Sequence, residues 1–342
     1  MFPVRLLPKL FLFDEDELLP ELRAQRQLNR SRVPELSRYI LENTDNYVFS
    51  AITVSIDAEV DFEPTPDASA QNRMGTLHVP LTARFIINDG QHRRAAIERA
   101  LREKPELGDE TIAVVFFLDI GLERCQQMFA DLNRYAVRPS KSLGILYDHR
   151  DETAKLTKAL IEQSAVFRGV VELERTSLSP RSRCLFTLSA IYQATAELVS
   201  SMPNGDPADL AAVALSFWEA VASCLHEWDL VRRGKLTSGE LRSNYIHSHG
   251  VALHALGRAG GCLIRCYPKQ WRERLVKLGE MDWRRDNGML WEGRALAGGR
   301  VSRGNQNVIL TANAIKRHLG LELSSEEQRV EHAFSRGNHG LT

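Results

Sequence analysis

The stretch RFIINDGQHRRAAIERAL, residues 84–101, joins two kinds of local structure at one turn. Its first residues are bulky and apolar, as in a buried strand, up to an Asp-Gly pair. Beyond that pair Ile97, Ala100 and Leu101 recur at helical spacing, which predicts a helix over Gln91–Glu103. A strand that runs into a helix is the building unit of α/β folds, so this stretch indicates the fold class.

The turn itself has the chemistry of an anion site. Gly90 permits φ > 0 and a close approach of a ligand to the backbone, and the first amides of a helix attract anions. Arg93 and Arg94 suit phosphate, His92 titrates near neutral pH, and Asp89 is able to cap the helix or hold a metal. The sequence predicts a phosphate cradle; the alternative is an ordinary turn with solvated arginines.

The segments around the turn complete a compact α/β pattern. Apolar positions predict a helix over residues 31–43, and β-branched and aromatic residues predict a strand within 47–64. Residues 76–88 predict one or two returning strands. The run TIAVVFFLDI at 111–120 is apolar on both faces, which predicts a central buried strand. A further helix is expected over 121–136.

The pattern changes near residue 150 of the 342-residue chain. We expect an α/β domain over residues 1–150, followed by a mainly α-helical, basic domain over 151–342. The segment 283–307 is rich in Gly, Arg and Trp and lacks a helical period. Long helices are predicted at residues 152–163, 185–201, 207–228 and 247–267.

Charge is unevenly distributed along a chain whose net charge is zero. Between Val231 and Gly320 there are 17 lysines and arginines and 6 acids, an excess of eleven positive charges. A basic face on an otherwise acidic body is typical of proteins that bind nucleic acid, and solubilising arginines scattered over helices are the alternative. The arginines expected to contact DNA phosphates are Arg284, Arg285, Arg294, Arg300 and Arg303.

Four polar residues follow the helix predicted over 121–136. Asn133, Arg134, Arg138 and Lys141 lie within one short connection. Folded over the turn, they would complete a polyanion site, with Asn133 donating hydrogen bonds and the cations neutralising phosphates. The alternative is a helix C-terminus at which Arg134 interacts only with the helix dipole.

Two further groups of side chains leave alternatives open. Tryptophans interleaved with arginines either stack on bases or pack in a core: Trp271, Trp283 and Trp291. A histidine group either binds a metal or caps and fills the core, and its spacing lacks a tight i, i+4 pair: His247, His249 and His254.

Composition excludes several classes of protein. Five cysteines without a C-x-x-C pair argue against a disulfide framework and favour a reducing cytoplasm. Cys262 and Cys266 share a helical face, and small buried side chains are the expected interpretation. No 18-residue apolar run and no signal-peptide cleavage site occur, so we expect no membrane association. Neither a P-loop nor a zinc motif is present, so we expect no metal.

Asp89–Arg93 spells DGQHR, and the chain resembles the DGQHR-domain family, in particular its DndB branch of DNA sulfur modification proteins. The resemblance covers most of residues 20–335, through QRQLNRSRVPELSRYI, MFADLNRYAVRPSKSLGILYDHRD, ERTSLSPRSRCLFTLSAIY and MDWRRDNGMLWEGRALAGGRV. It implies a ParB/sulfiredoxin-like fold whose turn holds nucleotide or backbone phosphate. It also implies a part in bacterial DNA phosphorothioation, with DNA binding and negative regulation of the modification genes.

Gln91 departs from two relatives. Sulfiredoxins place a reactive cysteine there, so the sulfiredoxin reaction is lost. ParB-type CTPases place a glutamate nearby, so hydrolysis here would have to use Asp89 or another acid. The leading hypothesis is a DNA-binding transcription regulator with double-stranded DNA, and with other phosphorothioation proteins, as partners. A homodimer is compatible with a two-fold operator. The alternative is a nucleotide hydrolase or nuclease of a restriction-modification system, using Asp89, His92 and Arg93 with Mg²⁺.

Salt dependence follows from the leading hypothesis. Each phosphate contact to duplex DNA releases counterions and steepens the dependence of affinity on salt. With about five contacts, log K is expected to fall with log salt at a slope of about −4 or steeper.

Overall fold

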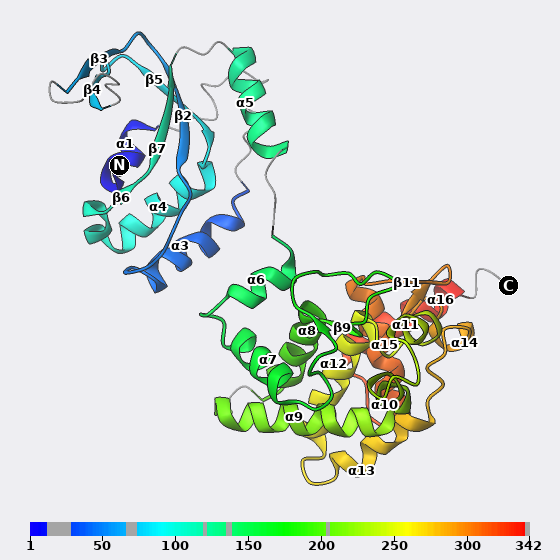
Figure 1. Ribbon diagram of the computed structural model, residues 1–342. Helices are drawn as coiled ribbons and strands as arrows, with labels where there is room; N and C mark the ends of the chain where they lie inside the picture. The colour runs from blue at the N-terminus through cyan, green and yellow to red at the C-terminus, as the bar shows by residue number, and fades with distance from the viewer. Residues whose placement is uncertain (12–28, 66–73, 119–121, 135–138, 203–205, 339–342) are drawn as a thin grey trace. The chain divides into compact units, whose positions relative to one another are not determined.

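The chain forms two compact units, Met1–Val137 and Arg138–Thr342, each described by itself. The division falls before residue 150 because α6 (Lys141–Tyr147) packs against α8 (Leu188–Ser200) of the second unit. The first unit mixes strands and helices and the second is mostly helical, as expected from the sequence. The computed structural model describes residues 1–11, 29–65, 74–118, 122–134, 139–202 and 206–338 (Figure 1).

A three-stranded sheet organises the first unit. β2 (Ile52–Asp57) lies in the middle, antiparallel to β5 (Arg84–Asp89) and parallel to β7 (Val114–Leu118). The alternate residues Ile52 and Val54 of β2 are fully buried, as a middle strand requires. The sheet thus brings the end of β5, where the DGQHR turn begins, next to the start of β2.

The strand predicted as central is an edge strand. Residues 111–120 divide into β6 (Thr111–Ile112) and β7, and β7 lies at one side of the described sheet. Val115 and Leu118 are 44% and 46% exposed, although an apolar run on both faces suggested complete burial. β6 pairs instead with β1 (Phe2–Pro3), a contact with the start of the chain that the local pattern did not indicate.

Helices cover the apolar residues of this sheet. α3 (Arg32–Glu42) packs on α4 (Gln91–Glu103), whose bounds are those predicted from the sequence (Figure 1). Ile40 and Ile97 contribute to the same core as the middle strand. The remaining elements of the unit are η1 (Val4–Leu6), α1 (Leu7–Leu10), β3 (Asp61–Pro64), β4 (Gly75–His78), η2 (Pro105–Asp109) and α5 (Leu122–Arg134).

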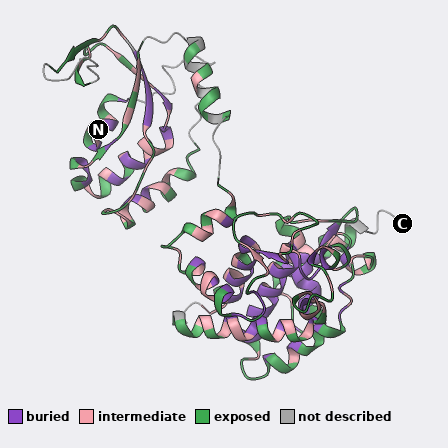
Figure 2. Ribbon diagram, in the orientation of Figure 1, coloured by how far each residue is buried: buried purple, intermediate pink, exposed green. Residues whose placement is uncertain are grey.

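The second unit is built around α12 (Gly250–Cys266), which is buried along most of its length (Figure 2). α12 packs on α8 and on α15 (Asn305–His318). Gly257 permits the approach to α8, because a Cβ there would lie 2.0 Å from the carbonyl oxygen of Ala194. Any larger residue at 257 would therefore push the two helices apart.

Shorter elements surround these helices. A hairpin of β10 (Leu296–Ala297) and β11 (Arg300–Val301) interrupts the segment predicted to be irregular. The others are α7 (Glu152–Gln163), β8 (Val171–Glu172), β9 (Phe186–Thr187), α9 (Pro207–Cys224), α10 (His226–Arg232), α11 (Ser238–Asn244), α13 (Trp271–Leu275), η3 (Val276–Glu280) and α14 (Gly288–Trp291).

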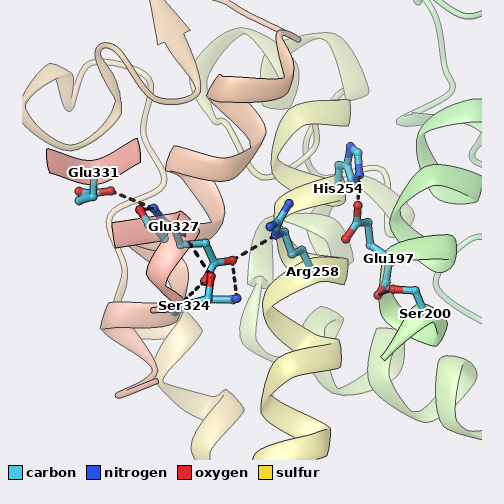
Figure 3. Close-up of polar contacts among 9 residues, drawn as sticks. Glu197, Ser200, His254, Arg258, Ser324, Glu327 and Glu331 are labelled. Atoms are coloured by element: carbon cyan, nitrogen blue, oxygen red, sulfur yellow. Dashed lines mark hydrogen bonds and ion pairs between the residues drawn. The ribbon is translucent and has the colours of Figure 1, made fainter. Parts of the chain in front are cut away.

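The last helix, α16 (Ser325–Asn338), is attached through two buried carboxylates. Glu327 accepts hydrogen bonds from Lys316 Nζ at 2.7 Å and from Arg258 Nε at 3.2 Å (Figure 3). Glu331 accepts from Arg317 Nη1 at 2.9 Å and also pairs with Arg294. Each glutamate is 2% exposed, so α16 provides the counter-charges for an internal group of cations.

The tryptophans and histidines whose roles the sequence left open pack within the second unit. Trp271, Trp283 and Trp291 are 6%, 5% and 0% exposed, so their faces are not available to bases. His247 is buried and accepts a hydrogen bond from Trp228 Nε1 at 2.9 Å, while His254 pairs with Glu197. No group of three possible metal ligands occurs within the described ranges.

No single described helix has the length and hydropathy to cross a bilayer. Residues 208–224 and 226–232 meet the criterion only when joined, and they meet at a bend of 94°.

Candidate nucleic-acid interface

Gly90 makes the turn between β5 and α4. Its φ of 113° and ψ of 12° lie in the left-handed region, and a Cβ there would come within 3.1 Å of the Ile52 side chain. Both facts require glycine at this position. The helix begins without a side-chain cap, so the positive end of its dipole lies at the turn, as predicted.

Arg93 is engaged inside the protein. Its Nη1 donates to the carbonyl oxygen of Ser50 at 2.9 Å and contacts the Ser50 hydroxyl, while Nη2 pairs with the Asp89 carboxylate. Only 13% of the Arg93 side chain is exposed. Its charge is therefore compensated by the acid of the same motif, and the guanidinium joins the start of α4 to the residues before β2.

Arg94 is also turned inward. Its Nη1 pairs with Glu98 at 3.1 Å, its Nη2 lies 3.4 Å from the carbonyl oxygen of Pro8, and its side chain is 12% exposed. The reason is the packing of α4 against α1, which places this face of the helix over the start of the chain. The cradle predicted at residues 89–94 thus has its two guanidiniums committed to internal partners.

His92 and Gln91 are likewise held by the backbone. His92 Nε2 accepts a hydrogen bond from the backbone amide of Asn29 at 2.9 Å. The ring proton therefore lies on Nδ1. Burial, followed by the charge of Arg32, lowers the His92 pKa, so the ring is neutral at pH 7. Gln91 is 8% exposed and donates to the carbonyl oxygen of Ile87.

The sequence did not indicate Ser50 or Asn29 as partners of the motif. Ser50 lies 43 positions before Arg93, and Asn29 lies 63 positions before His92. Neither has a spacing or residue type that would single it out. The one available signal was the position of Ser50 inside the segment 47–64 that was predicted to contain a strand.

Of the four polar residues predicted to fold over the turn, the side chains of Arg134 and Lys141 are described. Arg134 is exposed in the last turn of α5, a helix that contacts β5. Lys141 begins α6 and belongs to the second unit. The Asn133 side chain and Arg138 lie outside the described residues. Their part in a polyanion site stays a prediction.

In the second unit, Arg284 is neutralised locally. It makes a bidentate contact with Asp282, with Nε at 3.0 Å and Nη2 at 2.9 Å, and Asp286 lies 3.9 Å away. The hydrogen bonds from Arg284 lower the pKa of Asp282 to about 2. Two acids around one exposed arginine leave no net positive charge there for a phosphate.

Arg294 was expected to contact DNA and is instead an internal residue. It pairs with Glu331 and donates through Nη1 to the carbonyl oxygen of Leu310 at 2.8 Å. Its side chain is 13% exposed. The glutamate lies 37 positions away on α16, so the sequence around Arg294 shows only the cation and not its partner.

Three arginines keep an uncompensated charge near the β10–β11 hairpin, and we call Arg285, Arg300 and Arg303 the hairpin arginines. Arg285 donates to the carbonyl oxygen of Gly299 at 3.1 Å, at the hairpin turn, and Arg303 to that of Thr176 at 3.2 Å. Arg300 is exposed on β11. None of the three has a carboxylate partner within the described part of the chain.

The hairpin turn presents these cations on a rigid support. Gly298 and Gly299 have φ of 57° and 73°, the pair of left-handed residues that a two-residue hairpin turn requires. The Glu292 carboxylate accepts from both of their amides, which fixes the turn. Arg300 lies on the hairpin, Arg285 bonds to its turn, and Arg303 follows it closely in the chain. Three cations near one fixed turn suit the phosphate backbone of a nucleic acid.

Comparison with known proteins identifies the family. A model of the DndB family, described as DNA-sulfur modification-associated, matches residues 1–322. The chain therefore belongs to the DndB family, and its involvement is in DNA sulfur modification. No curated protein and no solved structure is matched. α16 lies beyond the matched range.

Replacing Arg93 by alanine is expected to destabilise the first unit by about 1–2 kcal/mol, because charge-assisted hydrogen bonds to Ser50 and a half-exposed ion pair are lost. Urea denaturation measures the change. Arg99→Ala is the matched control, since Arg99 is on the same helix and 51% exposed. A variant with unchanged stability that has lost affinity for phosphate would show instead that Arg93 is a ligand-binding residue.

Proposed function

We propose that the protein is a DNA-binding regulator of phosphorothioate modification that represses the modification genes. The hairpin arginines hold the phosphate backbone, and the second unit supplies most of the electrostatic affinity. Partners are duplex DNA and other proteins of the modification system. The proposal adds DNA binding and regulation to the sulfur-modification assignment.

The observation that carries the proposal is that three arginines without a carboxylate partner among the described residues lie near one hairpin. Arg284, Arg294 and Arg317 each have a carboxylate within 3.1 Å. Among the described residues, Arg285 and Arg303 bond only to carbonyl oxygens, and Arg300 is exposed without a carboxylate partner. An arginine whose partners are neutral keeps its full charge for an incoming phosphate.

The first unit has a supporting role in this proposal. A ParB/sulfiredoxin-like fold would place phosphate at the amides that begin α4, and the left-handed Gly90 with an uncapped helix start is compatible with this. Asp89 already pairs with Arg93 there. A phosphate would have to replace this carboxylate, so the turn contributes less affinity than the hairpin arginines.

A binding assay with three duplexes tests the regulatory role. The full chain is titrated against the promoter of the modification genes, a random duplex of equal length, and a phosphorothioated duplex. Tighter binding to the promoter supports repression, whereas equal affinity for promoter and random duplex contradicts it. Labelled ATP, CTP and plasmid are incubated with the wild type and with Arg93→Ala. Turnover by the wild type that is absent in the variant would show that the protein is an enzyme and would contradict the regulator proposal.

A further inference from the structure

A cavity of about 210 Å³ lies in the second unit where two helices begin. It is lined by the first residues of α8 and of α12, which are 13 and 17 residues long. The two starts are close together, since a Cβ on Gly250 would lie 3.4 Å from the Ala190 Cβ. Two helix dipoles therefore present their positive ends to one cavity.

The start of α12 has donors without acceptors. The amides of Gly250 and Val251 make no hydrogen bond to any described residue, and the N-cap residue, His249, provides none from its side chain. Its ring is occupied with the carbonyl oxygen of Arg242 at 2.7 Å. α8 differs, because the Thr187 hydroxyl accepts the amide of Ala190.

Ser248 adds a buried hydroxyl with no partner. The residue lines the cavity, is 4% exposed, and its Oγ has no hydrogen bond within the described ranges. Buried polar atoms are almost always paired, so an orphaned hydroxyl beside orphaned amides indicates that an acceptor binds here.

Charge at the cavity has one sign. Arg242 lines it, is 9% exposed, and has only carbonyl partners, among them Ser179 at 2.8 Å and Cys184. Arg303 lines it too, and no carboxylate does among the residues described. Burying a cation without a counter-ion costs free energy. A bound anion would reduce this cost by supplying the counter-charge.

The lowered pKa of His249 is consistent with the positive charge at the cavity. Burial, followed by the charges of Arg285, Arg303 and Arg242, lowers the His249 pKa to about 4, although the hydrogen bond to the Arg242 carbonyl oxygen acts to raise it. His249 is thus neutral at pH 7. Of the other groups at the cavity, His254 is held by Glu197, which accepts from it at 3.1 Å (Figure 3).

We propose that this cavity binds a phosphate-type oxyanion, either free or as the terminal phosphate of a larger molecule. Helix amides, a hydroxyl and a guanidinium are the donors that tetrahedral oxyanions take in proteins. The volume is below the roughly 300–1,000 Å³ of drug-sized ligands, so it suits a small anion or one phosphate group. The site shares Arg303 with the duplex binding proposed above but does not require that binding.

A pair of substitutions at Gly250 tests the site without deleting a side chain. Gly250 is the first residue of α12, where proline is tolerated because the amide it removes bonds to nothing in the helix. His249 has φ −87° and ψ 149°, which suits a residue before proline. Gly250→Ala adds a similar Cβ and keeps the amide. The two variants differ in the amide donor and in the ring atoms that proline attaches to the amide nitrogen.

Calorimetric titration with sodium phosphate is the measurement. We expect binding to the wild type, and the alanine variant should bind about ten- to hundred-fold more tightly than the proline variant. Ser248→Ala, which leaves the backbone unchanged, should weaken binding several-fold and provides a second test. Absence of phosphate binding in the wild type, or equal affinities of the two Gly250 variants, would overturn the proposal.

Oligonucleotides distinguish the source of the anion. A 5′-phosphorylated strand that competes with inorganic phosphate identifies a nucleic-acid end as a ligand, and competition by phosphate alone identifies a free anion. Either supports the site. Failure of duplex with 5′-hydroxyl ends to bind would count against the regulator proposal only, because that duplex lacks a terminal phosphate.

Discussion

Glu331→Ala is expected to destabilise the second unit by about 3–5 kcal/mol, the largest effect of any single substitution considered for stability. The carboxylate is 2% exposed and accepts hydrogen bonds from Arg294, Arg317 and Asn313. Its removal leaves the mostly buried Arg294 without a counter-charge. For a unit of this size the melting temperature should fall on the order of 10 °C.

A neighbouring acid provides the control for this substitution. Glu326 is exposed in the first turn of the same helix, so Glu326→Ala should cost less than about 1 kcal/mol. Thermal and urea melts of both variants measure the difference. Equal melting temperatures for the two variants would show that α16 is not attached through its buried carboxylates.

The same carboxylates predict how stability responds to acid. Burial by itself raises the pKa of Glu331, yet hydrogen bonds from Arg294 and Asn313 hold it below the ordinary 4.5, and Lys316 does the same for Glu327. A carboxylate whose pKa is lower in the folded state than in the unfolded state stabilises the fold. This stabilisation is fully present above the unfolded-state pKa and is lost as the pH falls through the folded-state pKa. The stability of the second unit should therefore decline below about pH 4.5.

Local patterns predicted the helices well and the strand order poorly. The bounds of α4 follow from apolar spacing and an Asp-Gly turn, both of which are local. The middle position of β2 is not local. An apolar run such as residues 111–120 has the same composition at the edge or centre of a sheet, and only the pairing of β2 with both neighbours decides between them.

The candidate site shows the same division between local and distant information. Charge and family motifs located the basic segment, and three of its five predicted arginines keep uncompensated charges. Arg294 differs because its partner Glu331 lies on α16, and Arg93 differs because Ser50 precedes a strand far earlier in the chain. Sequence identifies a cation, whereas structure alone shows which anion or carbonyl oxygen already holds it.

Affinity for duplex DNA is expected to depend strongly on salt. Each phosphate neutralised contributes about −0.9 to the slope of log K against log salt, so three hairpin arginines give about −3. The five contacts expected from sequence would give about −4 or steeper, and the internal pairs of Arg284 and Arg294 account for the lower value. Between 50 and 200 mM salt the affinity should fall by several tens of fold.

Single substitutions separate the hairpin from general charge. Arg300→Ala should weaken binding to all duplexes similarly and make the slope shallower by about 1. Arg265→Ala removes an equal charge from the last turn of α12, far from the hairpin along the chain, and should leave the slope unchanged. Similar losses in both variants would indicate that net charge, and not the hairpin, determines binding.

Fluorescence anisotropy with a blunt duplex bearing 5′-hydroxyl ends tests the central claim most directly. Titrations over a range of salt compare the wild type with a variant in which Arg285, Arg300 and Arg303 are all alanine. The account predicts a slope of about −3 for the wild type and one shallower than about −1 for the variant. Equal slopes and equal affinities would contradict the assignment of DNA binding to the hairpin arginines.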